Sequence, residues 1–193
     1  MNKNFNRYVN DTCKVIQKSY KVNETVLQKT VFMLSEALLN GKKILIYGNG
    51  GSAADAQHMA AELLVRLNLN RKAYPAIALT TDTSVITSCA NDFSFADVFS
   101  RQIEALGNNG DAAVAISTSG NSENVIKGIK AARKKGLYVI GLTGEDGGKM
   151  KNLCDILINV KSKNTMLIQQ VHVVFIHMIC DELEKKLTRI ENA

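Results

Sequence analysis

A strand-like apolar run that leads through a glycine turn into a helical segment constrains the fold of this 193-residue chain more than any other feature. Residues 44–46 are Ile-Leu-Ile, which predicts a buried strand, and Gly48, Gly50 and Gly51 follow. Glycines let the backbone approach a ligand closely, and the N–H groups from Ser52 onward open a helix N-terminus. This order predicts an α/β unit whose turn cradles a phosphate or a polyol.

Apolar runs and helical patterns alternate along the rest of the chain. Strands are expected at 43–47, 76–79, 112–116, 137–142 and 156–160, and helices at 52–67, 95–106, 123–135 and 164–187. A further short helix is expected to end at Asn91-Asp92. The alternation predicts an α/β fold in which a parallel sheet is covered by helices on both faces.

The chain is predicted to be a single domain over 1–193, because no repeat, linker or low-complexity segment interrupts it. The expected parts are an N-terminal helical pair over 1–40, with helices at 3–20 and 23–39, and an α/β core with a C-terminal helix over 41–193. Asn23 is a candidate N-cap of the second helix, and Gly41 a candidate end.

The composition argues against several classes of protein. The net charge is +6, but no basic stretch is interleaved with aromatic residues, so a nucleic-acid partner is not expected. Four scattered cysteines, without a Cys-x-x-Cys pair, indicate a reduced cytoplasmic protein. The first ten residues are polar and no apolar run approaches membrane-spanning length, so we expect neither a signal peptide nor a membrane partner.

A hydroxyl-rich loop follows the third expected strand. Its sequence is Ser117-Thr118-Ser119-Gly120-Asn121-Ser122, and a helix is expected directly after it. Serine and threonine are also common helix caps, but one cap would explain only one of four hydroxyls. In open α/β sheets, ligands bind beyond the carboxyl ends of strands, where this loop, the glycine turn and the polar loop 80–83 are expected. The hydroxyl-rich loop therefore predicts an anion site.

His58 and Glu62 are four residues apart on the helix that follows the glycine turn. At this spacing they share one helix face and can serve a metal ion or a proton transfer together. An ordinary exposed pair is the alternative, which the position beside a ligand loop disfavours. The turn is neither Gly-x-Gly-x-x-Gly nor a Walker loop, so it predicts neither a dinucleotide nor ATP.

The expected C-terminal helix carries Gln169, His172 and His177 within an apolar run. Gln169 and His177 lie about 80° apart around the helix and roughly 12 Å apart along it. His172 is one turn from Gln169, which makes it the easier co-ligand by spacing alone. His172 is equally compatible with the role of a buried core histidine.

These motifs together resemble the phosphoheptose isomerases of the sugar isomerase (SIS) superfamily. The resemblance rests on Gly48-Asn49-Gly50-Gly51-Ser52, His58-x-x-x-Glu62, Asn91-Asp92-Phe93, 117–122, Leu142-Thr143-Gly144, Asp146-Gly147-Gly148 and Ile168-Gln169-x-x-His172, in order over about 40–180. It implies a SIS-type, flavodoxin-like five-stranded parallel sheet and a homotetramer with active sites between subunits. The implied reaction converts sedoheptulose 7-phosphate to D-glycero-D-manno-heptose 7-phosphate through an enediolate, for lipopolysaccharide core or capsule.

The resemblance also implies roles for individual residues. The implied substrate contacts are Asn49, Gly50, Gly51, Glu62, Asn91, Asp92, Ser117, Thr118, Ser119, Ser122 and Gln169. The implied ligands of one Zn²⁺ per subunit are His58, Glu62, Gln169 and His177. Glu62 and His177 fall on the acid–base pair, so the resemblance selects His177 rather than His172. We expect Glu62 to abstract the proton and His177 to shuttle protons at the sugar oxygens, although the reverse assignment stays open.

Two alternatives to this function remain at the level of the sequence. The chain resembles a non-catalytic scaffold of the same superfamily, the replication-initiator-associating protein, which shares the glycine and serine loops but lacks the acid–base glutamate and histidine. An isomerase for another phosphosugar is the second alternative. Some members of the family have an acidic residue near the position of Met166, and the loop 80–83 is one residue longer here than in some relatives. Both differences leave fine substrate preference open.

Overall fold

A five-stranded parallel sheet forms the centre of the computed structural model, which describes residues 3–192. The strands are β1 (Ile44–Gly48), β2 (Ala76–Ala78), β3 (Ala112–Ser117), β4 (Tyr138–Gly144) and β5 (Ile156–Val160). Their spatial order is β2-β1-β3-β4-β5, and all four pairs are parallel. This confirms the expected flavodoxin-like α/β sheet, with strand bounds within two residues of those predicted.

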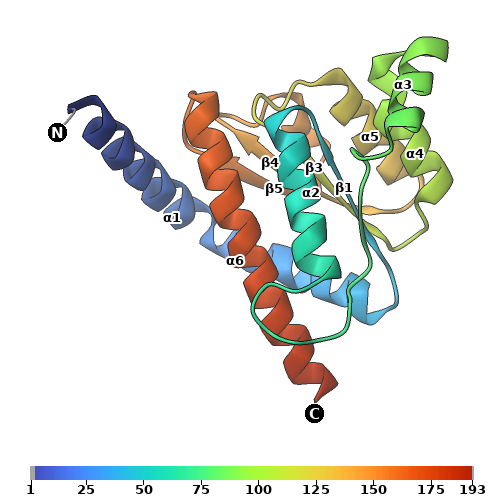
Figure 1. Cartoon of the computed structure of the whole chain (residues 1–193), viewed down its shortest axis with the longest axis horizontal. Coiled ribbons are helices and arrows are strands. Elements are labelled where there is room, and N and C mark those ends of the chain that lie inside the picture. The colour runs from blue at the N-terminus through green and yellow to red at the C-terminus, as the bar shows by residue number, and fades with distance from the viewer. Residues whose placement is uncertain (1–2, 193) are drawn as a thin grey trace.

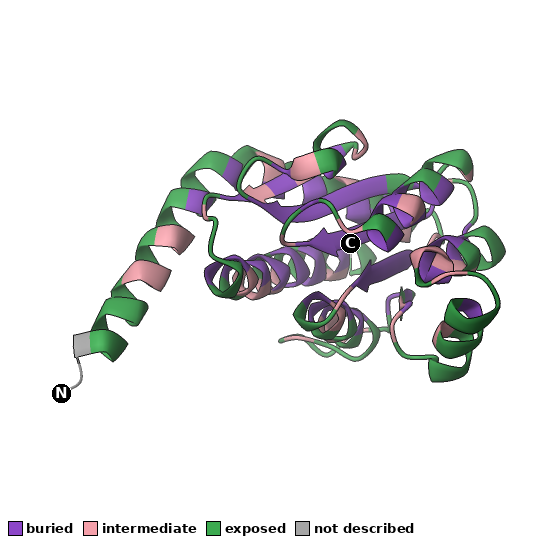
Figure 2. Cartoon of the chain, turned by 90° about the horizontal axis from the view of Figure 1, so that it is seen from above, coloured by how far each residue is buried: buried purple, intermediate pink, exposed green. Residues whose placement is uncertain are grey.

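Helices cover both faces of the sheet (Figures 1 and 2). The helices are α1 (Lys3–Leu39), α2 (Gly51–Leu64), α3 (Thr83–Asp92), α4 (Val98–Leu106), α5 (Glu123–Lys134) and α6 (Thr165–Glu191), with short 3₁₀ helices at Phe95–Asp97 and Gly148–Asn152. Apolar side chains of α1, α2 and α6 pack on one face of the sheet, and those of α4 and α5 pack on the other. The resulting two apolar layers fix the helices that begin at the ligand loops.

The N-terminal segment is one continuous helix, so the expected helical pair over 1–40 is wrong. Asn23 is not an N-cap: its side chain is buried, and its Nδ2 donates to the carbonyl oxygens of Ser19, at 2.7 Å, and Asn159, at 2.9 Å. Asn159 N donates back to Asn23 Oδ1, and Lys161 N donates to Ser19 Oγ. The polar side chains of Ser19 and Asn23 therefore do not mark a break in the helix. They make hydrogen bonds to the backbone at the free edge of β5, which α1 covers.

The strand order reverses direction between β1 and β3. In the parallel register Gly48 pairs with Ile116, so the carboxyl ends of these two strands lie side by side. The glycine turn after β1 and the hydroxyl-rich loop after β3 consequently leave the same edge of the sheet as neighbours. This reversal is where open α/β sheets bind their ligands.

Helix α6 differs from one expectation. Among the described residues, α6 is the one helix that is long and apolar enough to cross a membrane by length and composition, although no such run was expected. It packs against both α1 and α2, and 44% of its most apolar window is buried inside the fold. This packing is that of a core helix, and a core helix can also be long and apolar enough to meet the length and composition criterion.

Candidate active site

The glycine turn adopts the tight conformation that its sequence predicts. Gly50 has a φ of 54°, in the left-handed region that favours glycine. A Cβ on Gly48 would lie 2.7 Å from the carbonyl oxygen of Ile116, so only glycine permits the close contact between β1 and β3. Asn49 exchanges two 2.8 Å amide hydrogen bonds with Asn124 at the start of α5. This amide pair, in which Asn124 was not foreseen, joins the two ligand loops.

Two hydroxyls of the serine loop, those of Ser117 and Ser122, lie against one another, whereas Ser119 Oγ accepts from Asn121 N. Ser117 Oγ lies 3.0 Å from Ser122 Oγ, and the Ser122 side chain makes no capping hydrogen bond although Ser122 occupies the N-cap position of α5. Thr118 is half-buried and Ser119 is exposed. Helix capping therefore does not explain the serine at position 122. The absence of a capping hydrogen bond favours the alternative, an anion site at the start of α5.

The segment 144–150, which follows β4, contacts the serine loop through its backbone. Gly120 has a φ of 64°, its carbonyl accepts from Met150 N, and the Thr118 carbonyl accepts from Gly144 N. A Cβ on Gly120 would overlap the carbonyl oxygen of Gly147. The two segments are thus in backbone contact, and the loop is held at the ends of β3 and β4.

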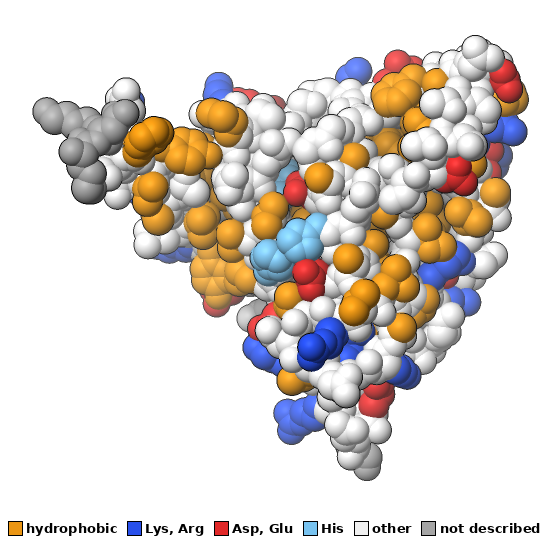
Figure 3. All heavy atoms as spheres, viewed as in Figure 1, with side chains coloured by type: hydrophobic (Ala, Val, Ile, Leu, Met, Phe, Trp, Pro, Cys, Tyr) orange, Lys and Arg blue, Asp and Glu red, His pale blue; other side chains and the backbone are white. Residues whose placement is uncertain are grey.

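His58, Glu62 and His177 come together between α2 and α6, as the family resemblance implied. His58 Nε2 lies 3.0 Å from Glu62 Oε1 and 3.1 Å from His177 Nε2. The two imidazole rings meet edge to face, with centroids 4.7 Å apart. Histidine side chains gather on the face that α2 and α6 present, and an acidic side chain lies beside them (Figure 3). The cluster is open to solvent, since 39% of the His58 side chain is exposed.

This cluster fits a zinc ion by donor type and by spacing. One ligand atom from each of the three residues lies within 4.8 Å of the others. Ligand atoms about 2.0–2.1 Å from a tetrahedral zinc lie roughly 3.3 Å apart, close to the two short distances here. A single proton on His58 Nε2 would face two acceptors at once, whereas one cation would satisfy all three groups.

Gln169, the fourth implied ligand, lies against the glycine turn. A Cβ on Gly51 would overlap the Gln169 side-chain amide, so α6 approaches the first turn of α2 closely at this point. Gln169 and the Gly51 backbone are therefore brought together. Its amide is a candidate for both the substrate and the ligand roles that the sequence assigns to it.

His172 faces away from the cluster and into the core. It is fully buried, and its Nε2 lies 3.2 Å from the carbonyl oxygen of Thr143 at the end of β4. Burial lowers the pKa of His172 to about 4, because imidazolium loses its hydration there. The interpretation of His172 as the easier co-ligand is wrong. It is a neutral core residue that ties α6 to the sheet.

The depressed pKa of His172 predicts acid-sensitive folding. Between pH 6.5 and about 4 the unfolded chain gains a proton at this residue and the folded chain does not, so stability falls as the pH falls. We expect this residue to contribute up to about 3 kcal/mol of that loss. His172→Gln, which can still donate to the Thr143 carbonyl, should lose less stability between pH 7 and 4.5 in urea unfolding. Equal losses in both proteins would contradict this.

Asn91 and Asp92 lie at the carboxyl end of α3, where both are exposed and Asn91 Nδ2 donates to Asp92 Oδ1 at 2.8 Å. Asp92 lines a groove between α3 and α4, whose walls include neither the glycine turn nor the serine loop. Within one chain, this groove does not bring the two residues to the loops. Their implied substrate role stays a prediction.

Asp55 belongs to the same helix as the cluster and was not foreseen. It lies one turn before His58, is 7% exposed, and its Oδ2 has no hydrogen-bond partner in the described part of the chain. Burial raises the pKa of Asp55 to about 6, and attraction to His58 opposes this shift. An acidic residue one turn into a helix carries no sequence signal that separates it from a surface charge.

Comparisons with known proteins place the chain in a family. A family model described as the SIS domain matches residues 5–144. The phosphoheptose isomerase of Paramagnetospirillum magneticum is 54% identical over 81% of this chain and 82% of that protein. The enzyme of the same name from Aliarcobacter butzleri is 50% identical over 91% of this chain and 93% of that protein.

A solved structure gives the same result for the fold. Phosphoheptose isomerase GmhA from Neisseria gonorrhoeae matches with a TM-score of 0.90 and 41% identity, covering 95% of this chain and 98% of that one. The high identity over most of both lengths extends the likeness from fold to sequence. The chain therefore belongs to the SIS-domain family and, within it, to the phosphoheptose isomerases.

Proposed function

We propose that the chain isomerises sedoheptulose 7-phosphate to D-glycero-D-manno-heptose 7-phosphate through an enediolate. The observation that carries this proposal is the convergence of Glu62 and His177 on His58, between the two helices that flank the glycine turn. Aldose–ketose isomerisation moves a proton between neighbouring carbons, which needs one group over the carbon and another at the oxygens. Membership of the phosphoheptose isomerases supports the same reaction.

The work is divided among these residues according to their chemistry. Glu62 abstracts the proton from the sugar carbon, and His177 moves protons at the neighbouring oxygens. Ser117, Thr118, Ser119 and Ser122 bind the phosphate with hydroxyls and with the N–H groups at the start of α5. The remaining substrate contacts are Asn49, Gly50, Gly51, Asn91, Asp92 and Gln169. The net positive charge of the chain helps to gather an anionic sugar.

A zinc ion is part of the proposal, held by His58, Glu62, Gln169 and His177. When bound, it would supply a Lewis acid that orients the sugar oxygens and orders the site. Glu62 cannot be a tight ligand and a free base at the same moment. The proton abstraction therefore belongs to a state in which the Glu62 carboxylate is free to reach the sugar.

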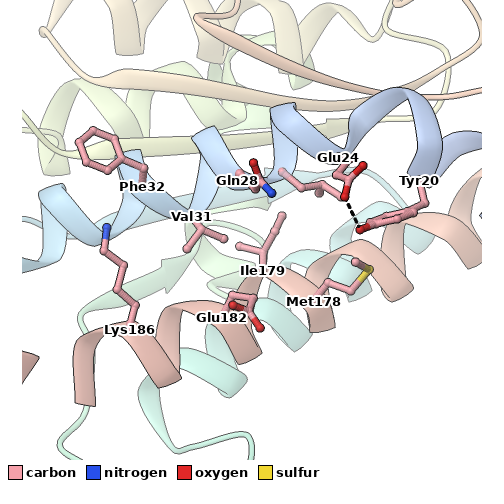
Figure 4. A pocket seen from close by; sticks show the side chains of 10 residues that line it. Tyr20, Glu24, Gln28, Val31, Phe32, Met178, Ile179, Glu182 and Lys186 are labelled. Carbon is pink, nitrogen blue, oxygen red and sulfur yellow. Dashed lines mark hydrogen bonds between the residues drawn. The ribbon is translucent and has the colours of Figure 1, made fainter. Parts of the chain in front are cut away.

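We also propose a homotetramer with active sites completed between subunits. The N-terminal half of α1 extends beyond the rest of the fold, and it exposes Phe5, Tyr8 and Val9 (Figure 1). Further along, α1 and α6 enclose a groove of about 370 Å³ beside the Tyr20–Glu24 hydrogen bond (Figure 4). Exposed apolar surface of this kind favours a second copy of the chain, which would also cover the open cluster. Sedimentation equilibrium should give a tetramer mass, and a monomer would contradict this assembly.

The product of this reaction would supply nucleotide-activated heptose for lipopolysaccharide core or capsule, in the cytoplasm. The test of the function is incubation of the purified chain with sedoheptulose 7-phosphate, with the aldose product followed by NMR. We expect conversion to an equilibrium mixture of ketose and aldose. A folded tetramer that forms no aldose would favour the scaffold alternative. Turnover of a pentose or hexosamine phosphate in its place would favour the other isomerase alternative.

A further inference from the structure

A buried ion pair joins the loop at the carboxyl end of α2 to the carboxyl-terminal half of α6, and these two helices carry the proposed catalytic residues. Arg71, in the loop after α2, lies with its Nε 3.1 Å from Glu184 Oε1 on α6, and the side chains of both are at most 2% exposed. The Arg71 guanidinium also lies 4.2 Å from the centre of the Tyr74 ring. A charge pair this deep requires partners for its remaining donors and acceptors.

Arg71 uses those remaining donors on the end of α2. Its Nη2 donates to the carbonyl oxygen of Glu62 at 2.7 Å, and its Nη1 donates to that of Leu63 at 2.8 Å. These are carbonyls of the last helical turn, which have no partner within the helix and lie at its negative end. Arg71 thus holds the peptide of Glu62 itself, the residue to which we assign proton abstraction.

Glu184 completes the arrangement from the side of α6. Its two carboxylate oxygens accept from the backbone N–H groups of Leu67, Asn68 and Leu69 at 2.7–3.0 Å. Burial alone would raise the pKa of Glu184, but these N–H groups and Arg71 outweigh it and hold the pKa below its usual value. The carboxylate is therefore charged and fixed. It lies seven residues after His177, two turns along nearly the same face of α6.

We propose that Arg71 and Glu184 act as positioning residues, forming a clamp that sets the carboxyl-terminal turn of α2, and with it Glu62, against His177 on α6. The inference rests on the proposed roles of Glu62 and His177. In the contacts described above, neither clamp residue touches the side chains of His58, Glu62 or His177, and of these residues Arg71 reaches only the backbone carbonyl of Glu62. Their effect on turnover passes through the backbone of α2. A small misplacement of a reacting group costs up to about 100-fold in rate.

The test compares Arg71→Lys and Glu184→Gln with a matched control, Asp111→Asn. Asp111 is also buried and bound to a cation, Lys43, and accepts from two backbone N–H groups, but at the amino ends of β1 and β3. Lysine keeps the charge of Arg71 but cannot reach Glu184 and two α2 carbonyls together. We expect both clamp variants to lose at least tenfold in kcat with KM within threefold, measured where every protein is fully folded. Asp111→Asn should lose stability but keep kcat within twofold.

A second readout needs no substrate and so separates this inference from the proposed function. In protein labelled with ¹³C and ¹⁵N at histidine, the ring signals of His58 and His177 should shift in both clamp variants and stay in place in Asp111→Asn. Unchanged ring signals together with native kcat would overturn the clamp. If the native chain has no isomerase activity, the proposed function fails, and the ring signals alone decide whether Arg71 and Glu184 position the cluster.

Discussion

Glu62→Gln is expected to reduce kcat by about 1,000-fold while leaving the fold and sugar binding nearly unchanged, because general acid–base groups contribute about 10²–10⁴-fold. Glutamine keeps the shape of glutamate and an oxygen that can accept from His58 Nε2, now 3.0 Å away. It cannot take a proton from carbon. The His58–Glu62 pair is only partly buried and is worth about a few tenths of a kcal/mol, so the melting temperature should hardly move. His177→Asn should lose turnover in the same way.

The measurement is steady-state turnover of sedoheptulose 7-phosphate, with calorimetric binding of the sugar to each variant. Glu104→Gln is the matched control, since it removes an exposed carboxylate of equal size from α4 and should keep native turnover. Turnover within tenfold of native in either Glu62→Gln or His177→Asn would refute the assignment of that residue.

Gly120→Ala is expected to have the second largest effect, because two costs coincide at this position. The φ of 64° disfavours any residue with a Cβ, and the added carbon would overlap the Gly147 carbonyl. Because the overlapping atom is a backbone carbonyl oxygen, which cannot rotate away as a flexible side chain can, the serine loop itself must move. We expect about 2–3 kcal/mol less stability and about 100-fold lower kcat/KM, mainly through weaker binding of the phosphate.

Gly41→Ala separates these two costs. Gly41 has nearly the same φ, 69°, but a Cβ there meets nothing within 4 Å, and it lies after α1 at the other end of β1. Backbone strain alone should cost about 1 kcal/mol and leave kcat/KM within twofold. Urea unfolding and steady-state kinetics on both variants check this. Equal kinetic losses in the two variants would show that the overlap with Gly147 does not matter.

The parts of the molecule that follow from the sequence are those set by local spacing. The glycine turn, the serine loop and the strands could be predicted because apolar runs, positive-φ glycines and hydroxyl-rich helix starts carry their signal within a few residues. His58 and Glu62 follow in the same way from a four-residue interval. The position of His177 beside them came from the family resemblance, since spacing alone favoured His172.

The parts that could not be predicted depend on partners far away in the chain. From the sequence alone Asn23 is a candidate helix cap. In the fold it makes hydrogen bonds to the edge of β5, more than 130 residues later in the chain. The sequence is compatible with two roles for His172, and only the packed fold brings the Thr143 carbonyl to its ring. The Asn49–Asn124 pair and the Arg71–Glu184 clamp likewise join segments whose contact only the packed fold creates.

A crystal structure of the Glu62→Gln tetramer with sedoheptulose 7-phosphate would show whether Glu62 and His177 act on the same sugar carbons. We expect carbons 1 and 2 of the sugar to contact both residue 62 and His177, with the phosphate on the hydroxyls and N–H groups of 117–122. A sugar bound with these carbons away from both residues, or with its phosphate at another loop, would contradict this expectation.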